Sequence, residues 1–126
     1  MLKKNLPTKR VVIAGCRNYN NYSEAKAFID LCLSDIRREN NIVIISGGAR
    51  GADALGERYA KENGFKVEKY PADWDTYGKS AGPRRNMQMA EKCDCAICFW
   101  DGKSRGTASM IEFTKQRNKP IRVKRI

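Results

Sequence analysis

Apolar residues along this chain fall into two patterns: short continuous runs, and longer stretches in which they recur every three or four positions. The continuous runs predict five strands. They lie at residues 10–15, 41–46, 65–70, 94–100 and 120–126. The spaced stretches predict four helices. They lie at residues 23–40, 51–63, 84–93 and 107–118.

The predicted strands differ in how much of their surface should be buried. The run at 41–46 is apolar almost throughout, which is typical of a parallel strand with both faces covered. The run at 65–70 alternates apolar and charged residues, which predicts an edge strand with one wetter face. Two residues mark predicted helix ends: Ser23 is the expected N-cap of the first helix, and Gly64 fits the C-cap of the second.

Strands and helices alternate along the whole chain, as in a parallel sheet that is covered by helices on both faces through right-handed crossovers. The connection at 71–83 is long and rich in turn formers, and we expect the chain to cross back there to the middle of the sheet. We therefore predict an α/β, Rossmann-like, doubly wound parallel sheet of five strands in the order 3-2-1-4-5. Ligands of such sheets bind in the crevice at the carboxyl ends of strands one and four.

Length and charge restrict the possible partners. A chain of 126 residues predicts one domain, 1–126, with basic tails at 1–9 and 125–126. The net charge of +11 indicates attraction to anions such as nucleotides or nucleic acid, although solvated surface and tails account for such an excess equally well. The apolar runs are too short for a membrane span or a signal sequence, so we expect a cytoplasmic protein that does not contact a membrane.

Cysteine and histidine usage limits the chemistry. The five cysteines are an odd number without framework spacing, which favours reduced thiols. Cys95 and Cys98 are three apart on a strand and should face opposite sides of the sheet, so the segment "CDCAIC" at 93–98 is not expected to bind metal. No histidine is present, and acid–base chemistry would need Asp, Glu, Tyr, Lys or Cys. We expect neither a metal nor another cofactor.

Glycines and polar residues gather where the strands should end at the crevice. The segments are "GCRN" from residue 15, "SGGARGAD" from 46, "GPRRN" from 82 and "WDGKSRGT" from 100. Glycine lets backbone N–H groups approach a ligand, and helix N-termini attract phosphate. The predicted ligand-binding residues are Gly15, Arg17, Ser46, Gly47, Gly48, Arg50, Gly51, Asp53, Arg84, Arg85, Asn86, Ser104, Gly106 and Thr107.

Within this set we expect the turn of Gly47, Gly48 and Gly51 to face Gly106 and Thr107 across one anion site. The alternative is a tight strand–helix turn that binds nothing, with Asp53 as a helix cap. Asp53 also suits a ribose hydroxyl.

Arginine and aromatic side chains adjoin these turns. Arg84 and Arg85 lie at a helix start, where the dipole disfavours cations, so at least one of them is expected to contact an anion. Trp74, Tyr77 and Trp100 are candidates to stack on a base; packing in the core or at the rim of the site is the alternative for each.

These segments together resemble the YspA-like family of the SLOG superfamily. The resemblance runs from Val11 to Val123 and rests on "GCRNY", "SGGARGAD", "YGKSAGPRRN" and "WDGKSRGT". It implies a Rossmann-like domain that binds nucleotides or nucleotide-derived ligands. The superfamily also includes the cytokinin-activating LOG phosphoribohydrolases, DNA-processing proteins and sensors of NAD-derived signals.

The LOG motifs can be transferred only in part. Their glycine turn corresponds to Gly47, Gly48 and Gly51, and their "RKxxM" helix resembles "RNMQM", which places their catalytic arginine on Arg85. Their "PGGxGTxxE" motif resembles "GKSRGTASM", which contains Gly106 and Thr107. The catalytic glutamate position, however, holds Met110. Glu112 lies two residues later, a helix rotation of about 200°.

Three functions remain open at this level. The favoured one is a domain that binds a nucleotide or a nucleotide-derived small molecule, as a sensor or binding module. The alternative is an N-glycosidase, or phosphoribohydrolase, acting on nucleoside monophosphates or NAD-like compounds, with Arg85, Asp53 and Asp101 as catalytic residues. The third is a nucleic-acid-binding module, for which the motifs offer no support. The oligomeric state stays open, a homo-oligomer included.

Overall fold

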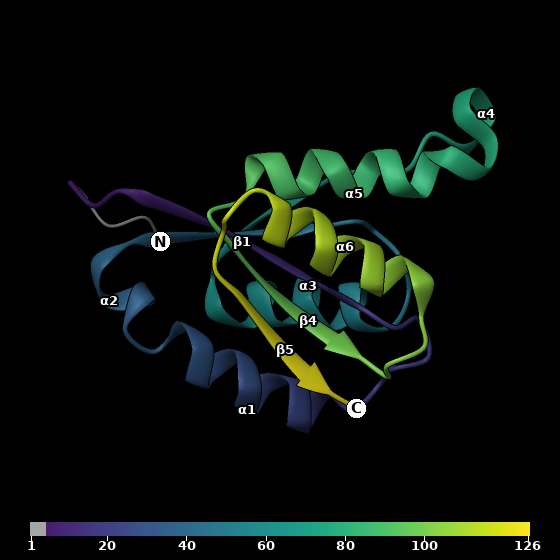
Figure 1. Ribbon diagram of the computed structural model, residues 1–126. Coiled ribbons are helices and arrows are strands. Elements are labelled where there is room, and N and C mark those ends of the chain that lie inside the picture. The colour runs from purple at the N-terminus through teal and green to yellow at the C-terminus, as the bar shows by residue number, and fades with distance from the viewer. Residues whose placement is uncertain (1–4) are drawn as a thin grey trace.

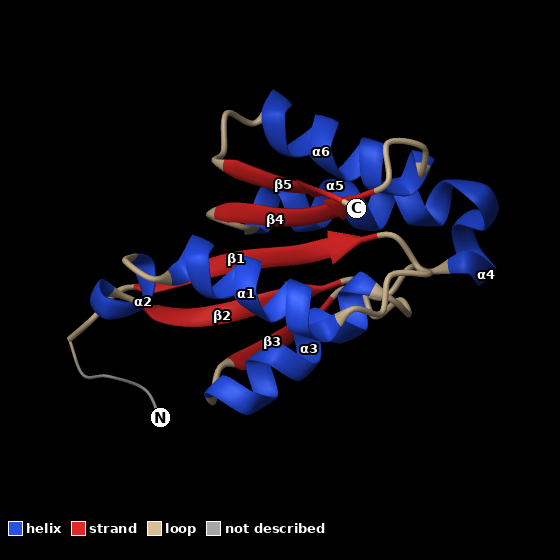
Figure 2. Ribbon diagram, turned by 90° about the horizontal axis from the view of Figure 1, so that it is seen from below, coloured by secondary structure: helices blue, strands red, loops and turns tan. Residues whose placement is uncertain are grey.

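The computed structural model describes residues 5–126 as a five-stranded sheet between two helical layers (Figure 1). The strands pair in the order β3-β2-β1-β4-β5, and every pair is parallel (Figure 2). The predicted fold class and strand order are therefore confirmed. β3 is an edge strand, as its alternating pattern indicates.

The elements have the following bounds. The strands are β1 (Thr8–Gly15), β2 (Asn41–Ser46), β3 (Lys66–Lys69), β4 (Cys95–Trp100) and β5 (Ile121–Arg125). The helices are α1 (Tyr22–Leu33), α2 (Ile36–Glu39), α3 (Ala52–Asn63), α4 (Trp74–Tyr77), α5 (Ala81–Lys92) and α6 (Arg105–Gln116), with a 3₁₀ turn η1 (Gly78–Ser80).

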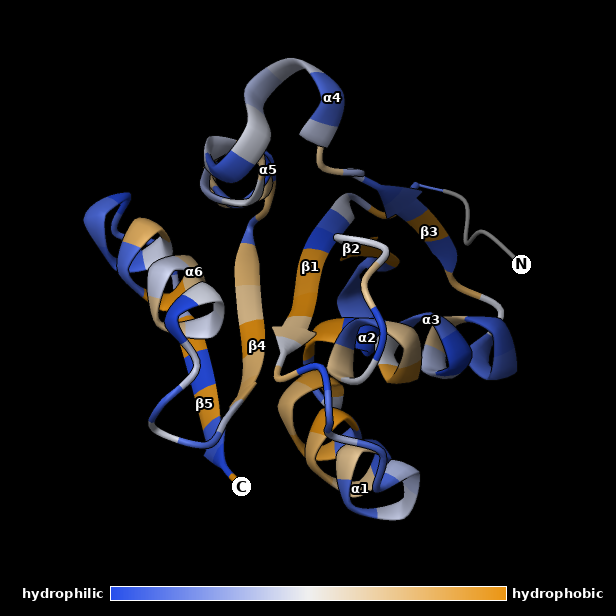
Figure 3. Ribbon diagram, turned by 90° about the vertical axis from the view of Figure 1, so that its right-hand side faces the viewer, coloured by the Kyte–Doolittle hydropathy of each residue, from blue (hydrophilic) through white to orange (hydrophobic). Residues whose placement is uncertain are grey.

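The helices divide between the two faces of the sheet. Viewed toward the carboxyl ends of the strands, α1 and α3 lie on one face and α5 and α6 on the other (Figure 3). Alternate residues of β1 enter two separate cores: Ile13 packs toward α1 and α3, and Val12 packs toward α5 and α6. Both are fully buried, which explains the continuous apolar run. Cys95 and Cys98 likewise pack in opposite cores.

The first predicted helix is wrong in two respects. The stretch 23–40 forms two helices, α1 and α2, because the chain turns at Ser34 and Asp35. Ile36 still packs against the same core as α1, so the apolar spacing continues across the break. The N-cap is Asn21 rather than Ser23, since the Asn21 side chain accepts the N–H of Glu24.

The other helix boundaries also move. The connection 71–83 contains α4 and η1, and α5 begins at Ala81, three residues earlier than predicted. α6 begins at Arg105 because Ser104 caps it. The predicted C-cap is confirmed: Gly64 is left-handed, with φ 71°, and its N–H contacts the last turn of α3.

The predicted tails are shorter than expected, because β1 begins at Thr8 and β5 reaches Arg125. The tail residues 1–4 lie outside the described residues. Across residues 5–126, no helix has the length and apolar character needed to cross a membrane.

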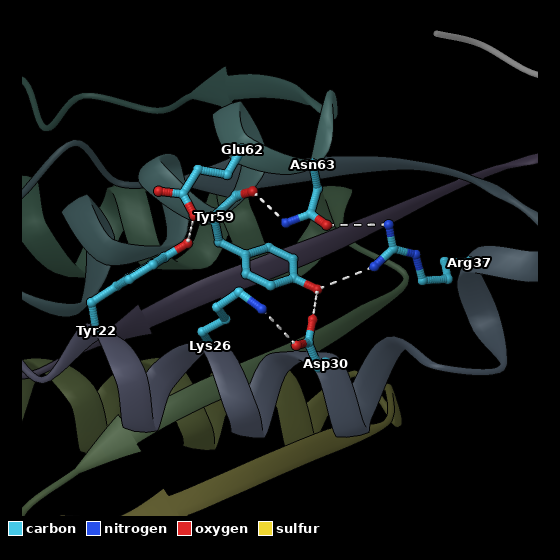
Figure 4. Close-up of polar contacts among 7 residues, drawn as sticks. All are labelled: Tyr22, Lys26, Asp30, Arg37, Tyr59, Glu62 and Asn63. Carbon is cyan, nitrogen blue, oxygen red and sulfur yellow. Dashed lines mark hydrogen bonds and ion pairs between the residues drawn. The ribbon is translucent and has the colours of Figure 1, made fainter.

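A polar network joins α1, α2 and α3 at the edge of one core (Figure 4). The Tyr59 hydroxyl donates to Asp30 over 2.6 Å, and Arg37 contacts both Tyr59 and Asn63. Lys26 pairs with the second oxygen of Asp30. The hydrogen bond from Tyr59 lowers the pKa of Asp30, and burial raises the pKa of Tyr59, so the pair stays an acceptor and a donor at neutral pH.

We expect Tyr59→Phe to lower the free energy of unfolding by about 1–2 kcal/mol, because the fully buried Tyr59 loses its hydrogen bond to Asp30. Urea denaturation measures the change. Tyr22→Phe is the matched control: Tyr22 is only partly buried, so loss of its hydrogen bond to Glu62 should cost less. An equal loss in both variants would contradict the special role of the buried Tyr59 side chain.

Candidate functional site

Two adjoining cavities open at the carboxyl ends of the strands. The first, called the inner cavity, has a volume of about 440 Å³ and lies between the end of β1, α5 and the start of α6. Its lining residues are Ala14, Gly15, Cys16, Arg17, Asn18, Ala49, Asp53, Arg85, Asn86, Met89, Asp101, Ser104, Gly106, Thr107 and Met110. It occupies the switch point of the sheet, where the topology predicts a ligand.

The second, called the outer cavity, has a volume of about 600 Å³ and lies between the turn after β2, the end of β3 and the start of α4. Its lining residues are Arg17, Gly47, Gly48, Ala49, Arg50, Lys69, Pro71, Ala72, Trp74 and Arg85. Arg17, Ala49 and Arg85 line both cavities, so the two volumes meet at these side chains.

Arg85 stands at the boundary between the two cavities. Its Nη1 donates to the carbonyl oxygen of Gly47 over 2.6 Å, and its Nε donates to Asn86 Oδ1 over 3.0 Å. Burial lowers the pKa of Arg85, which nevertheless stays protonated at any physiological pH. Within residues 5–126 it forms no ion pair and its Nη2 makes no hydrogen bond, so the N–H groups of Nη2 remain for a ligand.

The Ser46 side chain stabilises the turn after β2. This hydroxyl is fully buried, donates to Glu57 over 2.6 Å and accepts the N–H of Gly48 over 3.1 Å. Ser46 thus shapes the turn and does not line either cavity. Gly51 instead permits a close approach of two backbone segments, since its φ is +78° and a Cβ there would overlap the carbonyl groups of Cys16 and Arg17. Only glycine allows the two turns to pack this closely.

The start of α6 forms a wall of the inner cavity. Asp101 Oδ1 accepts the N–H groups of Lys103 and Ser104, both over 2.8 Å. These two bonds lower the pKa of Asp101. The Ser104 hydroxyl accepts the N–H of Thr107 over 3.4 Å. Asp101 therefore binds the loop before α6, and in the first turn of the helix Ser104 caps the Thr107 N–H.

Asp53 faces the inner cavity from the first turn of α3 and is 5% exposed. Its Oδ2 accepts the N–H of Ala49 over 3.3 Å, so it holds the turn rather than capping α3, whose N-cap is Gly51. Burial raises the pKa of Asp53 to about 6, although the Ala49 N–H and the Arg85 charge both oppose this shift.

The raised pKa of Asp53 links folding to pH. In the folded state Asp53 binds its proton more tightly than in the unfolded state, where its pKa is near 3.8. The stability that protonation contributes is therefore present below about pH 4 and is lost as the pH rises through 6. We expect the Asp53→Asn variant to have the same free energy of unfolding as the parent near pH 4. At pH 7.5 its free energy of unfolding should be higher by on the order of 2 kcal/mol. Denaturation at both pH values measures this, and a less stable variant at pH 7.5 would contradict it.

The three candidate aromatic residues differ in placement. Trp74 lines the outer cavity and is 51% exposed. Tyr77 is also exposed, and the Arg84 guanidinium lies 4.3 Å from its ring centroid. Trp100 lines neither cavity: its indole packs against both cores and donates to the Ser104 carbonyl oxygen. Trp74 alone is therefore placed to stack on a ligand in a cavity.

Comparison with known proteins identifies the family. The chain matches the model of the YspA, cpYpsA-related SLOG family over residues 9–77. This chain belongs to that family. A relative, the Gene 61 protein of Mycobacterium phage D29, is 32% identical over 120 residues, which cover 90% of this chain and 94% of the phage protein.

Solved structures share the SLOG fold at lower identity. DprA from Streptococcus pneumoniae superposes with a TM-score of 0.69 at 20% identity, over 94% of this chain and 50% of DprA. DprA from Helicobacter pylori superposes with a TM-score of 0.64 at 23% identity, over 94% of this chain and 66% of that protein. TM1055 superposes with a TM-score of 0.63 at 22% identity, over 90% of this chain and 72% of TM1055. This chain spans about half the length of the S. pneumoniae protein. At these identities the likeness establishes the Rossmann-like fold.

The SLOG domain does not bring all the predicted phosphate-binding residues to one point. Gly47, Gly48 and Arg50 line the outer cavity, whereas Gly106 and Thr107 line the inner one. Gly51 packs between two turns and lines neither cavity, and Arg84 lies outward beside Tyr77. Ser46 also lines neither cavity. The other predicted residues, Gly15, Arg17, Asp53, Arg85, Asn86 and Ser104, line the inner cavity, as does the candidate catalytic residue Asp101.

Several lining residues were not predicted from the sequence. Lys69 and Asn18 are the polar ones that matter most, since each carries a hydrogen-bonding head at a cavity. The signal for Lys69 was available: it is the last residue of β3, and the carboxyl end of every strand faces the crevice. Asn18 follows Arg17 after β1 and could have been included by the same rule.

Proposed function

We propose that this SLOG domain binds a nucleotide or nucleotide-derived small molecule across the inner and outer cavities. The observation that carries the proposal is that both cavities share Arg17 and Arg85 at the switch point of the sheet. Arg85 keeps unused N–H donors there, which suit a phosphate oxygen. The carboxylate of Asp53 and the amide of Asn18 suit the hydroxyls and base of a nucleoside, whereas the Asn86 amide already binds Arg85 and the Gly106 carbonyl oxygen.

A hydrolase is the second candidate, and Asp53 favours it. A carboxyl group with a pKa of about 6 in a cavity is suited to general acid–base chemistry near neutral pH. Asp101 is less suited to donate a proton because its own loop lowers its pKa. Against hydrolysis, Met110 stands where the LOG enzymes have a glutamate; it is 1% exposed and lines the inner cavity. Glu112 is exposed, on the other side of α6.

A nucleic-acid partner is the third candidate. The H. pylori DprA structure is described in terms of its single-stranded DNA binding mode. The observation in favour here is Trp74, an exposed aromatic ring beside the basic outer cavity, since stacking on aromatic rings and basic grooves together bind single strands.

Incubation with nucleoside monophosphates separates binding from hydrolysis. We expect calorimetry to detect binding of AMP or GMP that is tighter than binding of the parent nucleoside, while chromatography detects little or no release of the base. The reason is that removing one electrostatic stabiliser of a transition state costs roughly 10²–10³ in rate, whereas phosphate binding does not depend on it. Rapid base release that Asp53→Asn abolishes would instead establish the hydrolase.

A further inference from the structure

The two cavities differ in charge, and this difference orients the ligand. Four cationic side chains line the outer cavity, Arg17, Arg50, Lys69 and Arg85, and no carboxylate does. The inner cavity shares two of these arginines but also contains the carboxylates of Asp53 and Asp101. A phosphate chain is therefore favoured in the outer cavity and disfavoured in the inner one.

Few of the outer cations are neutralised by the protein itself. Lys69 pairs with Glu57 over 3.3 Å, and Glu57 is in turn fixed by the Ser46 hydroxyl. Across residues 5–126, the three arginines of the outer cavity form no ion pair. Three arginine side chains without an ion pair at one cavity are typical of a site for a multiply charged anion, although the Asp53 charge acts on one of them, Arg85.

The inner cavity has the chemistry of a nucleoside site. Its polar wall offers carboxylate oxygens to hydroxyl groups, and Ala14, Met89 and Met110 line it with apolar surface. At the start of α6, the other natural place for a phosphate, Ser104 accepts the N–H of Thr107, and Asp101 accepts the N–H groups of Lys103 and Ser104 in the loop just before the helix. An added anion there would meet the Asp101 carboxylate.

On the basis of the proposed function, we propose that the ligand is a nucleoside di- or triphosphate, or another nucleotide with a chain of at least two phosphates. Its nucleoside lies in the inner cavity and its phosphate chain in the outer one. The first phosphate lies at Arg85 and Arg17, which line both cavities. Arg50 and Lys69 line the outer cavity alone, so they contact only the phosphates beyond the first.

Calorimetry with the adenosine and guanosine series, from nucleoside to triphosphate, tests the chain length. We expect the diphosphate to bind at least about tenfold more tightly than the monophosphate, since it gains charge-assisted contacts. Arg50→Gln should remove most of this gain, because it weakens binding of the diphosphate more than binding of the monophosphate. Arg38→Gln, which neutralises an exposed arginine of α2, should preserve the gain. Equal affinity of mono- and diphosphates would overturn the inference and leave the proposed function standing, whereas no binding of any nucleotide would refute both.

Inorganic pyrophosphate tests the orientation. A Cβ built on Gly106 meets no atom within 4 Å, and Gly106 lines the inner cavity, so Gly106→Val adds bulk to the wall of that cavity. We expect this variant to lower nucleotide affinity at least about tenfold and to lower pyrophosphate affinity far less, while Arg50→Gln lowers pyrophosphate affinity. Loss of pyrophosphate binding in Gly106→Val with retention in Arg50→Gln would place the phosphates at α6 and contradict the orientation. Tight binding of a dinucleotide that depends on Trp74, without any gain from mono- to diphosphate, would also contradict it.

Discussion

Arg85→Ala should weaken binding of a nucleotide by about 1.5–3 kcal/mol, which is about 10- to 150-fold in Kd. The guanidinium is held between Gly47 and Asn86 and still has N–H groups directed to neither. Its removal deletes a charge-assisted contact at the one boundary that both cavities share. Calorimetry with the same nucleotide on parent and variant gives the difference directly.

Two further variants separate the contact from other effects of losing Arg85. Arg38→Ala removes the same charge from an exposed position on α2, at the opposite end of the strands, and should change affinity little (Figure 1). Arg85→Gln removes the charge but keeps a polar side chain at this position, and it should retain the fold while still losing affinity. Equal losses in Arg85→Ala and Arg38→Ala would mean that only net charge attracts the ligand.

Gly51→Ala should lower the free energy of unfolding by about 3–5 kcal/mol, the sum of backbone strain and overpacking. The residue has φ +78°, and its added Cβ would overlap the backbone of Cys16 and Arg17. That close approach also allows Ala52 to donate to the Cys16 carbonyl oxygen over 3.1 Å. Chemical denaturation measures the loss.

Two other glycines of the site form a graded control series. Gly48 has φ +74° but open space around it, so Gly48→Ala should show the strain alone, about 1–2 kcal/mol. Gly106 has neither a positive φ nor a close neighbour, so Gly106→Ala should be near neutral. A Gly51→Ala protein as stable as Gly106→Ala would refute the packing role of Gly51.

The sheet could be predicted because its signals are local and redundant. The apolar run of β2 and the alternating run of β3 each indicate how many faces are covered, and the long connection after β3 indicates the crossover. The break between α1 and α2 could not be predicted, since Ile36 continues the apolar spacing and no glycine or proline interrupts it. The short α4 had one signal, Asp73, which caps it by accepting the Thr76 N–H.

The site was predicted less well than the fold, for a physical reason. Topology places the turns at one end of the sheet, but the reach of one side chain divides that end into two cavities. Arg85 lies across the crevice to the Gly47 carbonyl and thereby separates Gly47 from Gly106. Spacing in sequence carries no information on this contact, nor on whether Ser46 faces a ligand or its own turn.

Chemical-shift mapping by NMR during titration with ADP or GDP tests the central claim most directly, because every backbone N–H reports independently. The account predicts that the largest shifts fall on residues lining the two cavities, among them Gly48, Arg85 and Gly106, while α2 and the amino ends of the strands stay unchanged. Shifts concentrated at the amino ends of the strands, or spread evenly over the basic surface, would contradict it.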